Sequence, residues 1–292
     1  MSKYETSSIG TIVMTNQRLI EVVPYDPAWP ELFNIEAPLI KNALGDNCIA
    51  VYHIGSTSVL GLPAKPVIDI LPVVRDIMLV DHVTQAMNQL GYEAKGEYGI
   101  LFRRYFQKGV TIRSHQVHVF EDNNPEIERH LKFCAWMRQH EDDRNAYAKL
   151  KQELAQQHPH DIDSYCFGKD EFIANINRKT GHSGLRIVKA LTNREWDAAC
   201  NFRQNYFLRQ QITNDPDTWT FEHQDHVHFI LYKDTDIVGY MHIQLCPNHI
   251  AVIQMMMIAE LHHNRDVGEK FSVLAERWLN QQGFTMIQTK NS

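Results

Sequence analysis

A turn of small residues followed by a single acid is the pattern in this sequence best suited to chemistry on phosphates. The turn is Gly55-Ser56-Thr57, and the acid is Asp69, which stands alone in the apolar run 67–71. Glycine lets the backbone approach a phosphate closely, hydroxyls and amides donate hydrogen bonds, and a carboxylate on the next strand can hold a bridging metal. The pattern predicts a site for a nucleoside triphosphate with Mg2+, in which Asp69 is the metal ligand.

Basic side chains flank this pattern. Lys65 precedes the apolar run, and Arg103 and Arg104 lie on a later strand-like segment. Lysine can neutralise a phosphate, and arginine can clamp a phosphate or a carboxylate with two parallel hydrogen bonds. Because neighbouring residues of a strand point to opposite faces, we expect one of the two arginines to reach the site and the other to be solvated. The alternative for Lys65 is an ordinary surface lysine.

Two histidines, His115 and His118, lie three positions apart on a predicted strand, so they point to opposite faces and cannot readily share a ligand. We select His118 as a catalytic candidate beside Ser56 and Asp69. The alternative for His118 is a histidine whose hydrogen bonds are satisfied within the sheet. The alternative for Asp69 is a buried carboxylate paired with a cation, because an isolated carboxylate in an apolar strand is costly.

The elements that must position these residues follow from hydrophobic periodicity and from Gly and Pro positions. The run 67–71 is apolar on both sides, which is typical of a central strand. The first half predicts strands at 49–53, 67–71, 100–107 and 110–120 and helices at 30–44, 80–90, 124–139, 147–154 and 169–177. The second half predicts strands at 185–187, 227–232, 237–245, 250–258 and 284–288 and helices at 193–205 and 268–282. The fold class is therefore α/β or α+β.

Two domains are expected, because 292 residues is about twice the usual length of one domain. The stretch 178–184 combines charge, glycine and small polar residues without periodicity and marks the boundary. We predict a polar extension at 1–18, a first domain at 19–178, a linker at 179–184 and a second domain at 185–292.

Composition limits the partners. A formal net charge of -6 argues against a long nucleic acid, whose non-specific binding depends on clustered Lys and Arg. The five cysteines lack any CxxC spacing and predict free thiols. No uninterrupted apolar run is long enough to span a membrane, so small-molecule substrates and a cytoplasmic location are expected.

The segment HIGSTSVLGLPAKPVIDIL at 53–71 resembles the signature of the GrpB family, also called UPF0157. Shorter matches follow at 97–99, 103–106, 118–119 and 165–173. The resemblance implies a DNA polymerase β-like nucleotidyltransferase fold. In that superfamily two carboxylates stand one residue apart after the Gly-Ser turn, and here Leu71 occupies the second position. Nucleotide binding is then expected from Gly55, Ser56, Thr57, Lys65, Arg103 and Arg104.

The segment 239–268 and the helix after it resemble the central part of a GNAT acetyltransferase. In that family the loop before the helix holds the pyrophosphate of acetyl-CoA with backbone amides. The resemblance implies that Arg265, Val267 and Gly268 bind acetyl-CoA. His263 and Asp266 depart from the family pattern, and the chain stops where the family continues, so a shortened or degenerate GNAT-like domain is expected.

Two further expectations concern the second domain. His226 and His228 share one face of a strand, which we expect to be a solvated edge. The strand near 285–288 is expected to offer an exposed edge through which a homodimer could form.

Three functions remain open from the sequence. The chain could transfer a nucleotidyl group to a small acceptor, it could transfer an acetyl group, or both folds could serve only for sensing or interaction. Leu71 and Asp266 keep the third alternative open.

Overall fold

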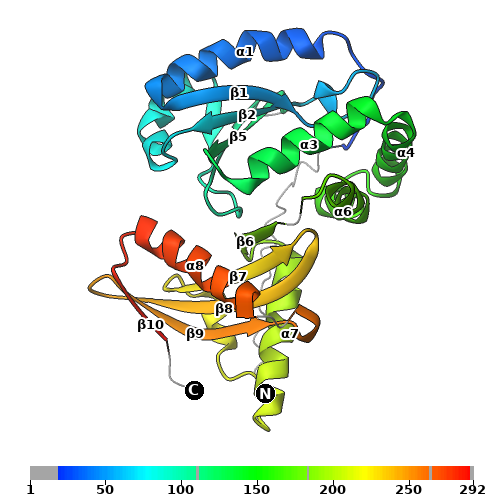
Figure 1. The fold of residues 1–292 in the computed structure, drawn as a ribbon. Helices are drawn as coiled ribbons and strands as arrows, with labels where there is room; N and C mark the ends of the chain where they lie inside the picture. The colour runs from blue at the N-terminus through cyan, green and yellow to red at the C-terminus, as the bar shows by residue number, and fades with distance from the viewer. Residues whose placement is uncertain (1–18, 110–111, 183, 263–264, 290–292) are drawn as a thin grey trace, which may run out of the picture.

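The computed structural model describes residues 19–109, 112–182, 184–262 and 265–289. The predicted extension at 1–18 and His263 lie outside these residues. Figure 1 shows two separate sheets, each with its own helices. Among the described helices, none is long and apolar enough to cross a membrane. All five cysteines are free, as predicted.

The first sheet is mixed, with strand order β1-β2-β5-β4-β3. β2 runs parallel to β5, and the other neighbours are antiparallel. The acid-bearing strand β2 lies inside the sheet, between β1 and β5, so the prediction that it is not an edge strand is confirmed. The strands are β1 (Cys48–Ile54), β2 (Ile68–Val74), β3 (Tyr92–Ala94), β4 (Arg103–Lys108) and β5 (His115–Glu121). The helices are α1 (Trp29–Leu44), α2 (Thr84–Gln89), α3 (Pro125–Gln139), α4 (Glu141–Gln157), α5 (Ile162–Phe167) and α6 (Asp170–Lys179).

Helices cover both faces of this sheet, as Figure 1 shows for α1 on one side and α3 on the other. On β2, Ile68 and Ile70 pack toward α1, whereas Leu71 and Val73 pack toward α3, α4 and α6. Because side chains alternate along a strand, Asp69 shares the second face with Leu71. The side chain of Asp69, the only acid of β2, therefore points toward the layer formed by α3 and α4.

Several elements of this domain differ from the sequence prediction. The strand expected at 110–120 is β5, which begins at His115, and the short elements β3 and α5 were not predicted. The helix expected at 80–90 is a 3-10 segment, Met78–Val83, followed by the short α2. The strand expected from residue 100 begins only at Arg103, because Gly99 and Phe102 have positive φ angles of 84° and 64°. Leu101 and Phe102 instead pack into the core of the second domain, where burial outweighs their strand propensity.

The second sheet has the order β10-β9-β8-β7-β6, and the predicted succession of strands and helices is confirmed. α8 packs on one face of it and α7 on the other. β10 runs parallel to β9 and pairs only with residues 250–253. The strands are β6 (Leu185–Lys189), β7 (His226–Lys233), β8 (Asp236–Cys246), β9 (Ile250–Ile258) and β10 (Met286–Thr289). The helices are α7 (Asn193–Arg209) and α8 (Arg265–Gln281).

The loop before β4 joins the two domains. The backbone N–H of Lys189 donates to the Gly99 carbonyl at 3.0 Å. The indole Nε1 of Trp278 on α8 donates to Glu97 Oε2 at 2.9 Å. The same loop therefore contacts the second domain and, through the start of β4, the polar face of the first sheet.

Candidate functional site

The Asp69 carboxylate lies against the backbone of Gly55. β1 pairs antiparallel with β2 and places Ile54 opposite Asp69, so the turn after β1 stands beside the acid. Gly55 has a φ of 68°, and a Cβ atom at this position would overlap the Asp69 carboxylate. Glycine is required here both by the left-handed backbone and by the close contact.

His118 on β5 holds Asp69 from the neighbouring strand. Its Nε2 lies 3.6 Å from Asp69 Oδ1, and its Nδ1 lies 3.3 Å from Arg103 Nη1. Since a guanidinium can only donate, the hydrogen-bond network assigns the imidazole proton to Nε2, facing the carboxylate. Burial lowers the pKa of His118, although Asp69 acts to raise it. His115 points to the other face, beside Tyr92, so the predicted opposition of the two histidines is confirmed.

A second strand residue, which the sequence did not single out, also contacts the acid. With the Gln116 amide oriented so that its nitrogen faces Asp69, this nitrogen donates to Oδ1 at 3.1 Å. The amide oxygen then accepts from Arg113 Nη1 at 3.2 Å. Glutamine has no special meaning in a strand pattern, and only the parallel pairing of Asp69 with Gln116 reveals the contact.

A buried lysine from α4 reaches the turn. Lys151 is only 2% exposed, its Nζ lies 2.9 Å from Ser56 Oγ, and it also donates to the carbonyl of Pro63. Burial, and then the charge of Lys169, lower the pKa of Lys151 to about 7. The sequence analysis did not find this residue, although one signal was present. Lys151 occupies a core position in the helix, four residues after Tyr147.

Two further lysines share one aromatic ring. The Nζ atoms of Lys65 and Lys169 lie 5.1 Å and 4.3 Å from the centre of the Tyr165 ring. Burial is the first cause that lowers the pKa of Lys65, and the charge of Lys169 is the second. Neither lysine forms an ion pair with a carboxylate among the described residues. Positive charge therefore gathers beside the turn.

Some residues predicted for the site face elsewhere or are engaged in the fold. Arg104 points to the opposite face and pairs with Asp81 through both carboxylate oxygens, at 2.6 and 2.8 Å. The expectation that one arginine would be solvated is wrong, because Arg103 and Arg104 are each only 6% exposed. Arg103 donates to the carbonyls of residues 97 and 98 and so holds the interdomain loop. The Thr57 hydroxyl donates to the Val67 carbonyl, at 3.4 Å.

The donor set of the described residues does not fit a metal held by the protein alone. No group of three or more His, Cys, Asp or Glu suited to a metal occurs among these residues. Leu71, at the position of the second acid, is fully buried in the core under α3 and α4. Asp69 is therefore the one carboxylate available on this part of β2.

In the second domain, two residues predicted to bind acetyl-CoA line a groove between α8 and β9. The groove has a volume of about 590 Å3, and Arg265 and Gly268 lie along it with Met256 and Ser272. Arg265 is paired with Glu269 at 2.7 Å. Val267 packs instead against the domain core.

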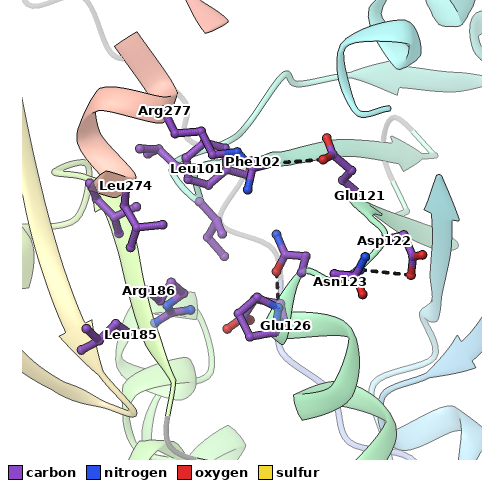
Figure 2. A pocket seen from close by; sticks show the side chains of 14 residues that line it. Leu101, Phe102, Glu121, Asp122, Asn123, Glu126, Leu185, Arg186, Leu274 and Arg277 are labelled. Atoms are coloured by element: carbon purple, nitrogen blue, oxygen red, sulfur yellow. Dashed lines mark hydrogen bonds and ion pairs between the residues drawn. The ribbon is translucent and has the colours of Figure 1, made fainter. Parts of the chain in front are cut away.

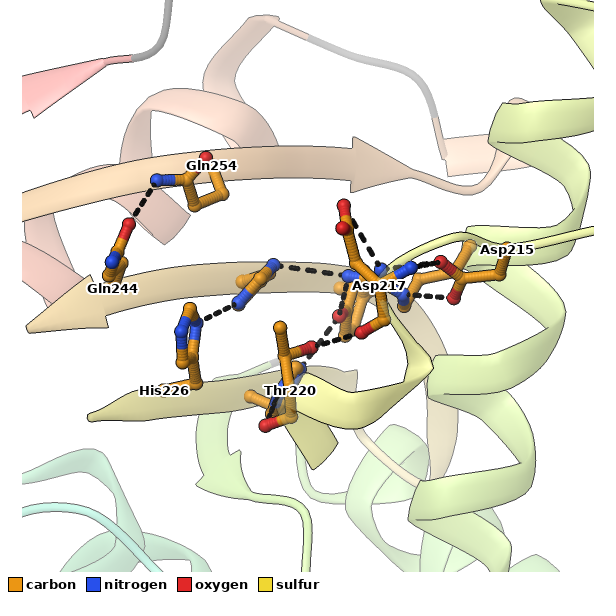
Figure 3. A network of polar contacts seen from close by, with 10 residues as sticks. Asp215, Asp217, Thr220, His226, Gln244 and Gln254 are labelled. Carbon is orange, nitrogen blue, oxygen red and sulfur yellow. Dashed lines mark hydrogen bonds and ion pairs between the residues drawn. The ribbon is translucent and has the colours of Figure 1, made fainter. Parts of the chain in front are cut away.

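A buried polar network crosses the sheet of the second domain (Figure 3). Arg203 is 1% exposed, pairs with Asp215 at 2.5 Å and lies 3.1 Å from His242 Nδ1. His242 Nε2 then lies 2.8 Å from His226 Nδ1. His228 is 4% exposed and bonds the Tyr240 hydroxyl, at 2.8 Å. The expectation of a solvated edge is therefore wrong for His228.

A second cavity, of about 340 Å3, lies between the two domains (Figure 2). Arg277 of α8 closes one side by pairing with Glu121 at 3.1 Å. Arg186 of β6 and Glu126 of α3 line it from opposite domains. Glu126 is itself paired with Arg129 at 2.6 Å, so two of the acids that line this cavity, Glu121 and Glu126, are already in ion pairs.

The fold and the site define a mixed α/β protein of two domains whose first domain gathers cations around one acid. Residues 19–179 match the family model described as GrpB protein, and the chain belongs to the GrpB family. UPF0157 protein YqkA of Bacillus subtilis is 46% identical over 170 residues, which are 58% of this chain and 50% of that protein. The chain thus spans about half the length of this relative.

Solved structures are similar to parts of this chain. A conserved protein GrpB from Enterococcus faecalis is 45% identical, with a TM-score of 0.53, and covers 55% of this chain and 96% of its own. A GNAT family acetyltransferase of Staphylococcus aureus covers 37% of this chain and 87% of its own, at 14% identity and a TM-score of 0.31. A likeness at that level carries no argument about activity.

Proposed function

We propose that the first domain binds the phosphate groups of a nucleotide between the Gly55–Ser56 turn and the ring of Tyr165. The observation that carries this proposal is the pair of ammonium groups of Lys65 and Lys169 over that one ring, because no carboxylate of the described residues forms an ion pair with either of them. Two neighbouring cations repel each other, and a bound polyanion removes that repulsion. A phosphate chain supplies such charge.

Asp69 has a different part in this proposal. Its carboxylate would repel a bare phosphate, so it favours a nucleotide that arrives with Mg2+, to which Asp69 contributes one oxygen. His118 and Gln116 orient that carboxylate. Holding a Mg2+ with one carboxylate and substrate phosphates needs no second protein acid.

The activity we infer is transfer of the nucleotidyl group to a small acceptor. It is supported by the Ser56 hydroxyl at the turn and by the family's resemblance to nucleotidyltransferases. The competing proposal is a domain that binds a nucleotide without turning it over. The burial of Leu71 in the core supports that alternative, because the second acid of the superfamily pattern is missing.

Isothermal titration of the full chain with the Mg2+ complexes of ATP, GTP, CTP and UTP tests the binding. We expect Lys65→Met and Lys169→Met each to weaken binding about tenfold, which corresponds to about 1.4 kcal/mol. Lys149→Met is the matched control, since that side chain lies on the exposed side of α4. Absence of binding by the wild type to every nucleotide, or unchanged affinity in both lysine variants, contradicts the proposal.

We also propose a second function, binding of an acyl-CoA by the second domain. β10 pairs with residues 250–253 of β9, and the later half of β9 lines the groove together with Arg265 and Gly268. Gly268 has open space around it, so Gly268→Leu would fill the groove without a clash in the free protein. Acetyl-CoA should bind the wild type and not this variant. Equal titration curves for the two proteins contradict the proposal.

The homodimer stays a prediction. β10 is an edge strand of the second sheet, and Met286 on it is exposed. An unpaired edge can add the strand of another chain. The variant Ile287→Pro removes a backbone donor on that edge. Sedimentation equilibrium should therefore show a dimer for the wild type and a monomer for this variant. A wild-type monomer refutes it.

A further inference from the structure

Lys151 and Ser56 form a hydrogen-bonded pair below the glycine turn. Lys151 projects from α4 toward the sheet, and its Nζ lies 2.9 Å from Ser56 Oγ. The turn that carries Ser56 is fixed by its own hydrogen bonds, because the Ser58 hydroxyl donates to the Gly55 carbonyl at 2.8 Å. The amine and the hydroxyl are therefore held in contact by two rigid elements.

No carboxylate among the described residues forms an ion pair with Lys151. Its hydrogen-bond acceptors are the neutral oxygens of Ser56 and Pro63, and its Nζ lies 4.8 Å from the Tyr147 ring centre. The titratable or charged side chains that line this region are Tyr147 on α4, Cys134 and Arg138 on α3, Tyr165 and Lys169 from α5 and its C-terminal end, Lys65 before β2 and Asp69 on β2. Of these, Lys169 exerts the charge effect on Lys151, and it disfavours a second cation.

The hydrogen bonds of the pair suit an uncharged amine. A neutral amine has two N–H groups and one lone pair. The Pro63 carbonyl can only accept and takes one N–H. The Ser56 hydroxyl, which accepts from a charged Lys151 Nζ, can instead donate to the lone pair of the neutral amine across the same 2.9 Å contact. A buried ammonium with no counterion is the costlier state.

We propose that Lys151 is a general base that removes the hydroxyl proton of Ser56 and makes Ser56 Oγ a nucleophile toward phosphorus. This use of Ser56 on a nucleotide rests on the function proposed above. Ser56 is partly exposed and Lys151 is buried, so an electrophile can approach the serine while the lysine stays covered. A lysine that is neutral near pH 7 is a known partner for a nucleophilic serine.

The step balances with a nucleoside triphosphate. Ser56 Oγ forms a bond to the α-phosphorus, the bond from that phosphorus to the pyrophosphate oxygen breaks, and Lys151 Nζ takes the hydroxyl proton. Lys65 and Lys169 neutralise the departing pyrophosphate. In the second step an acceptor hydroxyl or amine attacks the phosphorus and releases its own proton to water, the bond from Ser56 Oγ to the phosphorus breaks, and Lys151 returns its proton to Ser56 Oγ.

A fluorophosphonate probe tests the nucleophile without any nucleotide. Ser56 Oγ bonds to the probe phosphorus, fluoride leaves, and Lys151 takes the proton. We expect peptide mass spectrometry to locate the adduct on Ser56 and the labelling rate to fall at least 100-fold in Lys151→Met. Lys151→Arg keeps a cationic donor that cannot lose its proton, and this variant should be labelled as slowly as Lys151→Met. Lys149→Met, on the exposed side of the same helix, should be labelled at the wild-type rate.

The pH profile separates a base from a merely structural lysine. Because the pKa of Lys151 lies at about 7, the labelling rate should be about tenfold higher at pH 8.5 than at pH 6 and should level off above pH 8. A rate that keeps rising tenfold per pH unit beyond pH 8 overturns the proposal, as does equal labelling by Lys151→Met. Circular dichroism of each variant shows whether it is folded, and Lys151→Arg replaces Lys151→Met if the latter is not.

Incubation with ATP labelled at the α-phosphorus links this inference to the proposed function. Label retained on Ser56 after denaturation supports both. If the fluorophosphonate labels Ser56 but no nucleotide binds, Ser56 is a nucleophile and a nucleotide is not its substrate. Nucleotide binding without any Ser56 adduct from either reagent overturns the inference and leaves the nucleotide site standing.

Discussion

Replacing Lys151 with methionine should make this protein more stable, and by an amount that depends on pH. In the folded chain burial holds the pKa of Lys151 at about 7, against a value of 10.5 when exposed. At 1.36 kcal/mol per pKa unit, this difference corresponds to a penalty of about 5 kcal/mol at acidic pH. Methionine removes the penalty but also loses the hydrogen bonds to Ser56 and Pro63, worth about 2 kcal/mol together.

The sign of the pH dependence follows from proton binding. Between about pH 7 and 10.5 the unfolded wild type binds one proton more at Lys151 than the folded protein does, so wild-type stability rises with pH in this window. The free energy of unfolding of Lys151→Met should therefore exceed that of the wild type by about 2 kcal/mol at pH 7. At pH 9 this difference should be smaller by about 2 kcal/mol, which leaves it near zero. Below pH 7 both states of the wild type bind the proton, and the difference becomes constant.

Urea unfolding of the two proteins at pH 6, 7, 8 and 9, followed by tryptophan fluorescence, measures this difference. Taking the difference between variants cancels the titration of all other groups that the substitution leaves unchanged. Lys149→Met should change stability by less than about 0.5 kcal/mol at each pH, because its side chain is 79% exposed. A difference between wild type and Lys151→Met that is constant from pH 6 to 9 would refute the depressed pKa.

Two further substitutions test the contacts of the site and of the interface. Gly55→Ala should destabilise the protein by about 2 to 4 kcal/mol, because it combines positive φ with a clash against Asp69. Gly45 also has positive φ but open space around it, so Gly45→Ala should cost about 1 kcal/mol in the same urea assay. Trp278→Phe removes the donor to Glu97 and should lower stability by about 2 kcal/mol, and faster amide exchange at residues 97–102 should accompany it. Similar costs for the two glycine variants, or unchanged exchange in Trp278→Phe, would contradict these contacts.

Local patterns predicted most of the fold. Alternation and caps located the central strand, and Asn124 with Pro125 fixed the start of α3, where the Asn124 side chain accepts from the N–H of Glu126 at 3.0 Å. The failures have tertiary causes. Residues 100–102 look like a strand because they are apolar, but their apolar side chains serve the core of the other domain.

The candidate site was predictable only in part. Gly55, Asp69 and His118 meet because they belong to three adjacent strands, with Gly55 directly after β1, Asp69 on β2 and His118 on β5. Strand periodicity reveals which side chains share a face. Lys151 comes from a helix about eighty residues after Asp69, and no local pattern connects the two. A lysine in the apolar stripe of a helix is the one signal that points to it, because burial of an uncompensated charge demands a reason.

The most direct test of the phosphate site is a crystal structure of the full chain with a non-hydrolysable nucleoside triphosphate and Mg2+. The account predicts phosphate oxygens within hydrogen-bonding distance of the Nζ atoms of Lys65 and Lys169, beside the turn at Gly55. A triphosphate bound elsewhere, for example in the groove along α8, with these two lysines unchanged over the Tyr165 ring, would contradict it.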